Sequence, residues 1–377
     1  NHPGHRLRGA VFPGGIKEEN GLNYLWELVK ITFQTFTFMV TDLRYILIMA
    51  LVFVLVHRQY TKILQYEQGF FRLKRINPLM ETVTSLVYGI GGGMLATILF
   101  ILLGVSVSDA GVAYLWLAAL LLMFIDQRFL CFAYAGSLVS LATLLTGFPK
   151  IQIATLMALV AILHMVESFL IFVNGYHNAS PMFFKHASGK VVGGFALRKF
   201  WPMPTIALVG VVMVSSGLDL QSVPMPDWWP LFQSSLEVPD NHMLLHILFP
   251  LVVALGYSDF VQTELPKVRA RRSAGLLFGY SLLLLGLAYV ANQYPVLTIL
   301  PVLFSALGHE LVIYLGRRRE KEQTPVFKGD DGVMVLAVYP DSPAEKMGLE
   351  AGDVIRSING IAVENLHELA HQMTPWM

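Results

Sequence analysis

The chain has 377 residues, of which 55% are hydrophobic and only 14% are charged. A soluble domain of this length would need more charged side chains to cover its surface, so the composition excludes an ordinary soluble protein and predicts a polytopic helical membrane protein. The formal net charge of +1 gives no reason to expect a nucleic-acid partner, and none is predicted. The single cysteine, Cys131, excludes an intramolecular disulfide framework and a multi-cysteine metal site.

Residues 1–40 are predicted to be an N-terminal tail followed by an amphipathic helix on the membrane surface. Asn1–Asn20 is polar and lacks the apolar core of a cleavable signal peptide. Within Gly21–Val40, Glu27 and Lys30 lie one helical turn apart, which suits an interfacial helix better than a transmembrane span. Since no methionine opens the chain, we expect a fragment or a processed form.

Residues 41–316 are predicted to form an all-α transmembrane bundle of about eight or nine helices, because long apolar runs alternate with short polar segments. The runs are Asp42–Val56, Leu79–Gly104, Gly111–Ile125, Phe129–Thr146, Ile151–Asn174, Met203–Gly217, His242–Tyr257, Ala274–Ala291 and Pro295–Gly316. The Asp126–Arg128 turn between two of them is predicted to lie at the cytoplasmic face. Glycines at Gly89–Gly93, Gly275–Gly279 and Gly286 are predicted to allow close helix packing.

The distribution of charge predicts the orientation of the bundle. Lys and Arg are in excess in His57–Arg75, in Gly175–Pro202, in Ser258–Ser273 and in the Arg317–Arg319 start of the tail. In contrast, Leu218–Asn241 carries acidic residues and has no Lys or Arg. Since positive loops stay inside, we expect a multi-pass protein of the cell membrane whose C-terminal module is cytoplasmic.

After a basic linker at 317–326, residues 327–377 are predicted to form a small α+β module. Gly332–Val363 has the sequence GVMVLAVYPDSPAEKMGLEAGDVIRSINGIAV, in which short alternating strands are separated by Pro and Gly turns, and a helix follows. This order closely resembles a bacterial PDZ domain, whose sequences run GV-x-V-x-x-V-x-P-x-SPA-x-x-x-GL-x-x-GD-x-I-x-x-ING. Because the chain stops at Met377, before the last strands of that domain, we expect the module to be incomplete.

The PDZ resemblance implies that a peptide binds by adding a strand. It would lie beside Gly332–Val338 and against the helix Asn365–Met373, with its end facing the loop Lys328–Gly332. The implied peptide-binding residues are Gly329, Gly332, Val333, Met334, Val335, Leu336, Leu366, His367 and Ala370. Asp330 and Asp331 put negative charge where a peptide carboxylate would bind, so an internal or basic segment is the expected ligand.

The same helix contains His367-Glu368-Leu369-Ala370-His371, which matches the zinc-protease pattern H-E-x-x-H. An intramembrane protease of the site-2 type is therefore an alternative. In that family the motif lies in a membrane helix N-terminal to the PDZ domain, with a separate aspartate-bearing motif. Here it lies in the helix of the module itself, with Pro375 close behind and no evident third ligand. We predict solvent-facing histidines beside the groove, and no catalytic residue, cofactor or metal.

Two His–Glu pairs lie within predicted spans: His164 with Glu167, three residues apart on one helix face, and His309 with Glu310. A carboxylate inside a membrane is costly and suggests a functional site. Two interpretations stay open, namely hydrogen-bonded pairs that lock helices together, and ion coupling or metal binding. Convergence of the two His–Glu pairs on one cavity would favour an enzyme or transporter.

Four further features resemble the MinJ-type family of division-site topological determinants from Gram-positive bacteria. They are the amphipathic entry Trp26–Lys30, a basic first cytoplasmic loop, the segment His164–Ser168 (HMVES) and the segment Ser342–Asp353 (SPAEKMGLEAGD). Members of that family bridge a polar coiled-coil scaffold and a membrane-associated Min-type ATPase system at poles and septa, without enzymatic activity. The resemblance implies a membrane scaffold that contacts lipids and recruits cytoplasmic division or polarity proteins through its PDZ domain. A homo-oligomer is compatible with this role.

Two other classes of function remain as alternatives. One is an intramembrane metal- or ion-dependent enzyme or transporter centred on His164, Glu167, His309 and Glu310. The other is an accessory subunit of a secretion or proteolysis complex.

Overall fold

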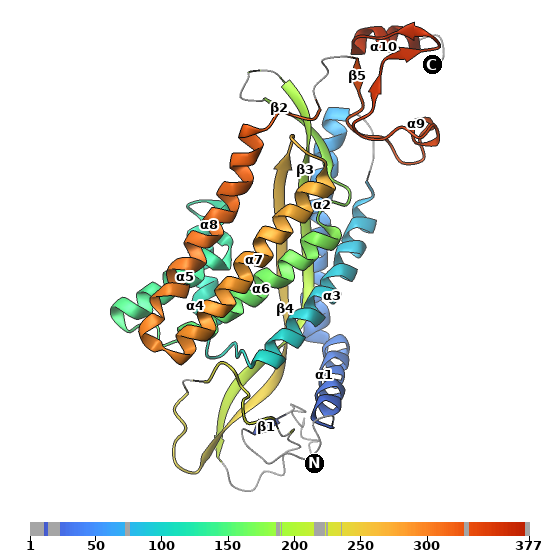
Figure 1. Ribbon diagram of the computed structural model, residues 1–377. Helices are drawn as coiled ribbons and strands as arrows, with labels where there is room; N and C mark the ends of the chain where they lie inside the picture. The colour runs from blue at the N-terminus through green and yellow to red at the C-terminus, as the bar shows by residue number, and fades with distance from the viewer. Residues whose placement is uncertain are drawn as a thin grey trace.

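Membrane helices lie on both sides of a long antiparallel pair of strands (Figure 1). The computed structural model describes residues 11–13, 23–71, 76–185, 189, 191–214, 223, 225–234, 236–327 and 332–373. Its helices before the C-terminal module are α1 (Asn23–Thr41), α2 (Leu43–Phe71), α3 (Pro78–Leu103), α4 (Val112–Met123), η1 (Gln127–Leu130), α5 (Phe132–Thr146), α6 (Ile153–Asn174), α7 (Pro266–Gln293), η2 (Pro295–Leu297) and α8 (Ile299–Glu322). The strands are β1 (Val11–Pro13), β2 (Ser180–Lys185), β3 (Val191–Val214) and β4 (His242–Val261).

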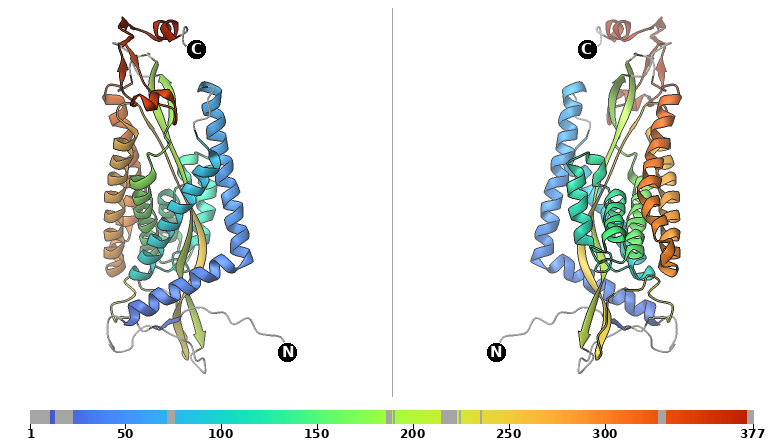
Figure 2. Two further views of the ribbon diagram at one scale, coloured as in Figure 1. Left: turned by 90° about the vertical axis from the view of Figure 1, so that its right-hand side faces the viewer. Right: turned by 90° about the vertical axis from the view of Figure 1, so that its left-hand side faces the viewer.

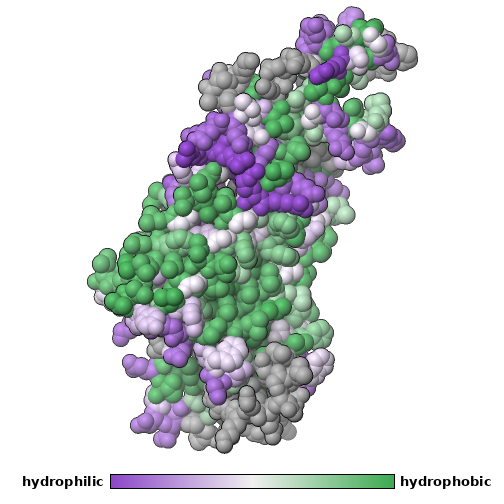
Figure 3. All heavy atoms as spheres, viewed as in Figure 1, coloured by the Kyte–Doolittle hydropathy of each residue, from purple (hydrophilic) through white to green (hydrophobic). Residues whose placement is uncertain are grey.

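Within the described residues, five helices are long and apolar enough to cross a membrane. They are Leu43–Gly69, Pro78–Leu103, Ile153–Asn174, Pro266–Gln293 and Pro295–Glu322. A broad apolar belt covers the middle of the molecular surface, and a polar band borders it on the side of the C-terminal module (Figure 3). The prediction of several apolar helices is confirmed, but the all-α architecture is wrong, and the count of eight or nine spans is not reached.

Two of the predicted spans, Met203–Gly217 and His242–Tyr257, fall in strands rather than helices. They belong to β3 and β4, whose antiparallel register begins with Phe195 opposite Val261 and continues to the end of β3. The complete sheet has the order β1-β4-β3-β2. Both predicted spans are largely apolar, and a largely apolar run has no period that distinguishes strand from helix.

Helix α3 packs directly on the backbone of β3. A Cβ atom at Gly89 would overlap the carbonyl oxygen of Pro202, and one at Gly93 would overlap that of Pro204. The glycine run therefore permits a helix–strand contact instead of the predicted helix–helix contact. The predicted packing role is wrong for three glycines of α7, where a Cβ would meet open space: Gly275, Gly279 and Gly286.

The edge of β3 that faces α3 raises a hydrogen-bonding problem. Strand β2 pairs with β3 only as far as Ala196, so the rest of this edge has no described strand beside it. A backbone N–H without a hydrogen-bond partner in a membrane interior has a free-energy cost on the order of several kcal/mol, like other unpaired buried polar groups. Two residues on this edge are Pro202 and Pro204, which have no N–H to satisfy.

Four further residues of this edge have polar partners in neighbouring helices and loops. These bonds run from Phe200 N–H to Tyr60 Oη (3.3 Å), from Ile206 N–H to Thr97 Oγ1 (2.9 Å), from Val107 N–H to the Leu208 carbonyl (2.8 Å) and from Gly210 N–H to Ser108 Oγ (2.9 Å). Between Phe200 and Gly210 the edge is thus closed by prolines and by these partners, which allows a strand to lie among membrane helices.

Helices α4 and α5 form a short hairpin that enters the bundle from one end. Gln152, just before α6, donates its N–H to the Asp109 carbonyl just before α4 (2.9 Å), so the hairpin base lies beside the start of α6. With twelve residues, α4 is only about 18 Å long. Its tip therefore reaches the middle of the bundle, where Arg128 contacts Glu310 of α8 at 3.1 Å. The predicted position of Asp126–Arg128 at the cytoplasmic face is wrong.

Helix α1 runs obliquely across the end of the bundle opposite the C-terminal module and meets α2 at a sharp bend (Figure 2). It is not among the five helices that could span a membrane, and Trp26 on it is 68% exposed. At the bend, Asp42 accepts the N–H of Arg44 and pairs with its guanidinium, which lowers the pKa of Asp42 to about 2. The location of α1 on the membrane surface stays a prediction.

The C-terminal module consists of short elements. They are β5 (Val333–Met334), α9 (Pro343–Lys346), β6 (Val354–Ile355), β7 (Ser357–Ile358), β8 (Ile361–Ala362) and α10 (Leu366–Met373). The predicted Asn359–Gly360 turn joins β7 to β8, and both residues have the positive φ (51° and 82°) that such two-residue turns require. Ser342 caps α9 by accepting the N–H of Glu345.

The two ends of the molecule differ in charge as predicted. The end of α2, the end of β2, the β4–α7 corner and the end of α8 all lie at the end that carries the C-terminal module (Figure 1). The described part of Leu218–Asn241 lies at the opposite end. The charged segments are grouped as expected although two predicted helices are strands, because β3 and β4 each cross the bundle once, as the predicted helices would.

Candidate functional site

The strand predicted to receive a peptide has one edge paired and one edge directed away from its partner. β5 pairs with β6 in antiparallel register. Val335 continues this pairing, because its N–H donates to Asp353 and its carbonyl accepts from Gly352, both at 2.8 Å. Since a strand alternates, the backbone N–H and C=O groups of Met334 and Leu336 point to the other edge. That is the edge at which an added strand would bind.

The residue that opens this strand must be a glycine. Gly332 has a φ of 121°, and a Cβ atom there would lie 2.8 Å from the carbonyl oxygen of Ile355. Val333 follows it in β5. Gly329, Asp330 and Asp331, which the sequence assigned to the end of the groove, lie outside the described residues.

The helix predicted to form the other side of the groove is exposed and capped by its own side chains. Leu366, His367 and Ala370 lie on α10, and all three are exposed. Asn365 Oδ1 accepts the N–H of Glu368 (3.0 Å), and the Glu368 carboxylate accepts from Asn365 Nδ2 (2.7 Å). The glutamate of the H-E-x-x-H match therefore stabilises the start of the helix, as in a capping box.

The module is attached to the membrane region through β3. Phe327, just before the module, accepts the N–H of Gly193 through its carbonyl (3.0 Å), and its ring packs edge-on against Phe195 at 5.3 Å. The side chain of Leu336 lies against Gly193, where a Cβ would come within 2.8 Å of it. The candidate peptide-binding strand is therefore held close to the end of the β-hairpin.

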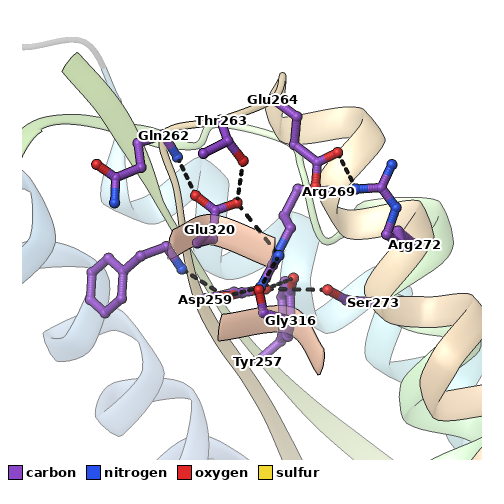
Figure 4. Close-up of polar contacts among 11 residues, drawn as sticks. Tyr257, Asp259, Gln262, Thr263, Glu264, Arg269, Arg272, Ser273, Gly316 and Glu320 are labelled. Atoms are coloured by element: carbon purple, nitrogen blue, oxygen red, sulfur yellow. Dashed lines mark hydrogen bonds and ion pairs between the residues drawn. The ribbon is translucent and has the colours of Figure 1, made fainter. Parts of the chain in front are cut away.

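A buried network around Arg269 fixes the segment that leads to the module (Figure 4). Arg269, only 4% exposed, binds both oxygens of Asp259 (2.7 and 3.0 Å) and donates to the carbonyl of Gly316 (3.1 Å). Glu320 of α8 accepts the N–H of Gln262 at 3.0 Å. Arg269 belongs to the basic segment Ser258–Ser273 that predicts the orientation of the bundle. In the structure it is buried, and its hydrogen bonds connect β4, α7 and α8.

A second buried ion pair lies at the start of α3. Lys199 Nζ lies 3.0 Å from a Glu81 oxygen, and the two side chains are 3% and 8% exposed. Asn178 donates a further hydrogen bond to Glu81. The pair joins α3, β3 and the segment after α6.

The histidines of the two predicted His–Glu pairs converge inside the bundle. His164 of α6 and His309 of α8 have ring centroids 5.2 Å apart. Cys131, at the start of α5, places its Sγ 3.1 Å from His164 Nε2 and 3.6 Å from His309 Nε2. Within the described residues, these three side chains form a group with metal-ligand spacing.

The two glutamates differ in surroundings. Glu310 accepts a hydrogen bond from Tyr134 (2.5 Å) and pairs with Arg128, so it belongs to a polar network beside the cluster. Glu167 lies one turn beyond His164 on α6. Sequence reasoning missed Cys131 and Tyr134, because neither stands near a histidine in the sequence.

A pocket of about 390 Å³ lies at the end opposite the module. It is lined by Trp229, Pro230, Gln233, Ser234, Met243, Leu244 and His246. No residue of the predicted sites lines it.

Comparison with known proteins supports the two parts of this architecture separately. Residues 334–371 match the family model described as PDZ domain. A stretch of 211 residues, or 55% of the chain, is 26% identical to the cell division topological determinant MinJ of Bacillus subtilis (strain 168), and it covers 49% of that protein. The chain thus spans about half the length of the curated relative it matches. No solved structure matches the chain.

The fold and these matches define a class: a protein with several apolar membrane helices and a C-terminal PDZ domain. Within that class the chain is similar to MinJ, and both the PDZ domain and the MinJ-like character predicted from the sequence are confirmed.

Proposed function

We propose that this protein is a membrane-bound adaptor that recruits cytoplasmic proteins through its PDZ domain during selection of the division site or organisation of the cell pole. The observation that carries the proposal is a PDZ domain attached to a membrane region whose relative is a cell division topological determinant. By this proposal the protein acts by binding and not by catalysis. Its site of action is the septum or pole of a Gram-positive cell, with the PDZ domain on the cytoplasmic side.

The geometry of the PDZ domain supports recruitment by strand addition. Met334 and Leu336 direct their backbone groups to the edge of β5 that β6 leaves open, and extended peptides bind PDZ domains at such an edge. Exposed Leu366 offers apolar surface on α10 for a side chain of the added peptide. Partners of the Min ATPase type and polar coiled-coil proteins are the proposed ligands.

The attachment of the domain supports an adaptor whose binding module has a fixed position. Glu320 and Phe327 tie the segment before the domain to the corner between β4 and α7 and to β3. A partner bound at the domain would be held near the membrane surface, because the tether is short and hydrogen-bonded.

Photo-crosslinking from inside the domain tests the proposed binding edge. A crosslinking amino acid at Leu366, which is 69% exposed on α10, is expected to capture division or polarity proteins in living cells. The matched control is Met347, which is 72% exposed beside α9 and away from α10. Equal capture at the two positions, or a uniform membrane distribution of a fluorescent fusion with normal division in a deletion strain, would contradict the proposal.

One observation favours a second candidate, an intramembrane metal- or ion-dependent enzyme or transporter. The convergence of His164 and His309 is the arrangement that this alternative requires. It predicts loss of a transport or hydrolytic activity on substitution of either histidine, whereas the adaptor predicts that partner capture at Leu366 persists. Reconstitution of the two variants in vesicles separates these outcomes.

A further inference from the structure

We propose that Cys131, His164 and His309 form a binding site for a zinc ion within the membrane region. This inference goes beyond the adaptor function and does not depend on it. It also departs from the sequence-based prediction of no metal site, because that prediction considered the cysteine and the histidines separately. The three ligand atoms, one Sγ and two Nε2, all lie within 4.8 Å of one another.

The spacing of the ligand atoms fits tetrahedral zinc. With Zn–S near 2.3 Å and Zn–N near 2.0 to 2.1 Å, a tetrahedral ion holds sulfur and nitrogen about 3.5 Å apart. The observed separations from Cys131 Sγ are 3.1 Å to His164 and 3.6 Å to His309. The two Nε2 atoms lie within 4.8 Å of each other, whereas a tetrahedral ion holds two nitrogens about 3.4 Å apart. Binding would therefore draw the two imidazole rings together by as much as about 1.4 Å.

The hydrogen bond of His164 prepares its ring for a metal. Its Nδ1 lies 2.7 Å from the Val160 carbonyl one turn earlier in α6. Since a carbonyl can only accept, Nδ1 carries the proton and Nε2 presents a lone pair to Cys131. A metal-binding histidine is oriented in the same way, with its second nitrogen donating to a carbonyl or carboxylate.

The ring of His309 is oriented in the same way, by a chain of hydrogen bonds through Tyr134 to Glu310. Tyr134 donates to Glu310 at 2.5 Å, so its hydroxyl oxygen is free to accept from His309 Nδ1 at 3.3 Å. The proton is therefore assigned to Nδ1, and His309 Nε2 also presents a lone pair to Cys131. Arg128 completes the chain by pairing with Glu310.

Two lone pairs thus face a single thiol. The thiol of Cys131 has one proton, so it can donate a hydrogen bond to His164 or to His309 but not to both. The Nε2 lone pair of the other histidine then faces a sulfur lone pair. A cation at the centre removes this conflict, because all three atoms become donors to it. On binding, Zn²⁺ replaces the thiol proton, which is released to water as H⁺, while both imidazoles stay neutral.

The ligand types select the metal. Thiolate and imidazole are poor ligands for Mg²⁺ and Ca²⁺, which prefer oxygen, and are preferred by zinc. The thiolate neutralises part of the charge of the ion in a medium where net charge is costly.

A bound ion would join three separate elements of the bundle. Cys131 caps the start of α5, His164 lies at the middle of α6, and His309 lies about 15 Å along α8. The hairpin of α4 and α5 enters from one end, so its tip would otherwise be held by polar contacts such as Arg128 with Glu310. Zinc would fasten this tip to the two long helices.

The test is the metal content and metal-dependent stability of the full chain purified in detergent. After dialysis against buffered Zn²⁺, the protein is expected to retain about one ion per chain, as a single tetrahedral site requires. Cys131→Ser and His309→Ala are expected to lose the ion, and zinc should raise the Tm of the unsubstituted protein but not of Cys131→Ser. Co²⁺ in place of zinc should give a thiolate-to-metal absorption band that disappears in Cys131→Ser.

A matched control separates this site from the H-E-x-x-H match in α10. The double variant His367→Ala/His371→Ala removes the exposed histidines and should keep both the ion and the absorption band. Zinc bound equally by Cys131→Ser, its loss in the α10 double variant alone, the absence of bound metal, or retention of copper in place of zinc would each overturn the proposal.

Discussion

Charged residues that look like surface cations in the sequence have buried roles in the structure. Lys199 belongs to a basic segment that predicts orientation, yet it is 3% exposed and binds Glu81 of α3. Arg269 likewise belongs to a basic segment and is buried against Asp259. The count of positive residues does not reveal which of them form buried ion pairs, because their partners can be distant in sequence.

The pair of Glu81 and Lys199 gives a test at this scale. Glu81→Gln removes the carboxylate charge that lies 3.0 Å from the buried Lys199 ammonium, so we expect a loss of about 3–5 kcal/mol in the free energy of unfolding. Thermal or denaturant unfolding in detergent measures it. Glu27→Gln is the control, because Glu27 and Lys30 form an exposed pair that should contribute only about 0–1 kcal/mol. Similar losses in the two variants would show that the buried pair contributes no more to the free energy of unfolding than the exposed pair.

Two of the three members of the candidate metal cluster can be recognised in the sequence, and the third cannot. His164 and His309 stand out because ionisable groups are rare in apolar runs. Cys131 does not, since it lies 33 residues from one histidine and 178 from the other. Only the packing of α5, α6 and α8 brings the three together.

At the scale of elements, the contact between α3 and β3 depends on two glycines one helical turn apart. Gly89→Ala would place a methyl group on the carbonyl oxygen of Pro202, so the strand or helix must move. We expect a lower Tm and a loss of about 1–3 kcal/mol, as for other overpacked interfaces. The measurement is thermal unfolding in detergent.

The control for this variant lies in the same helix. A Cβ atom at Gly91 would meet open space, so Gly91→Ala should leave the Tm unchanged or raise it slightly through helix propensity. If Gly89→Ala were as stable as Gly91→Ala, the close approach of α3 to β3 would be wrong.

The two strands were predicted as helices for a physical reason. Met203–Gly217 and His242–Tyr257 are largely apolar, and a strand inside a membrane region can have the same composition as a membrane helix. The informative signal is Pro202 followed by Pro204, because prolines at alternate positions suit a strand edge and would break a helix. The PDZ elements were predictable because local turn residues such as Asn359–Gly360 specify them.

At the scale of the whole molecule, the PDZ domain is tied to the membrane region by a short tail. Glu320 holds the tail by accepting from Gln262 and from the Thr263 hydroxyl. Glu320→Ala removes both acceptors and leaves Arg269 with one carboxylate fewer. We expect faster proteolytic cleavage between α8 and the PDZ domain, with the membrane region intact.

The exposed pair on the same helix turn provides the comparison. Glu322→Ala removes only the partner of Arg318, and both of those side chains are more than half exposed. Its cleavage rate should match that of the unsubstituted protein in the same limited-proteolysis assay. Identical rates for the two variants would mean that Glu320 does not hold the tail.

The edge of β3 sets a condition on the order in which the chain is assembled. A pair of strands with an open edge cannot enter hydrocarbon by itself, since its amides would have no partners. The groups that cover this edge, Tyr60, Thr97, Val107 and Ser108, all precede β3 in the chain and are synthesised first. The ribosome therefore delivers the covering helices before the strand that needs them, and a circular permutation that reversed this order should leave β3 exposed during insertion.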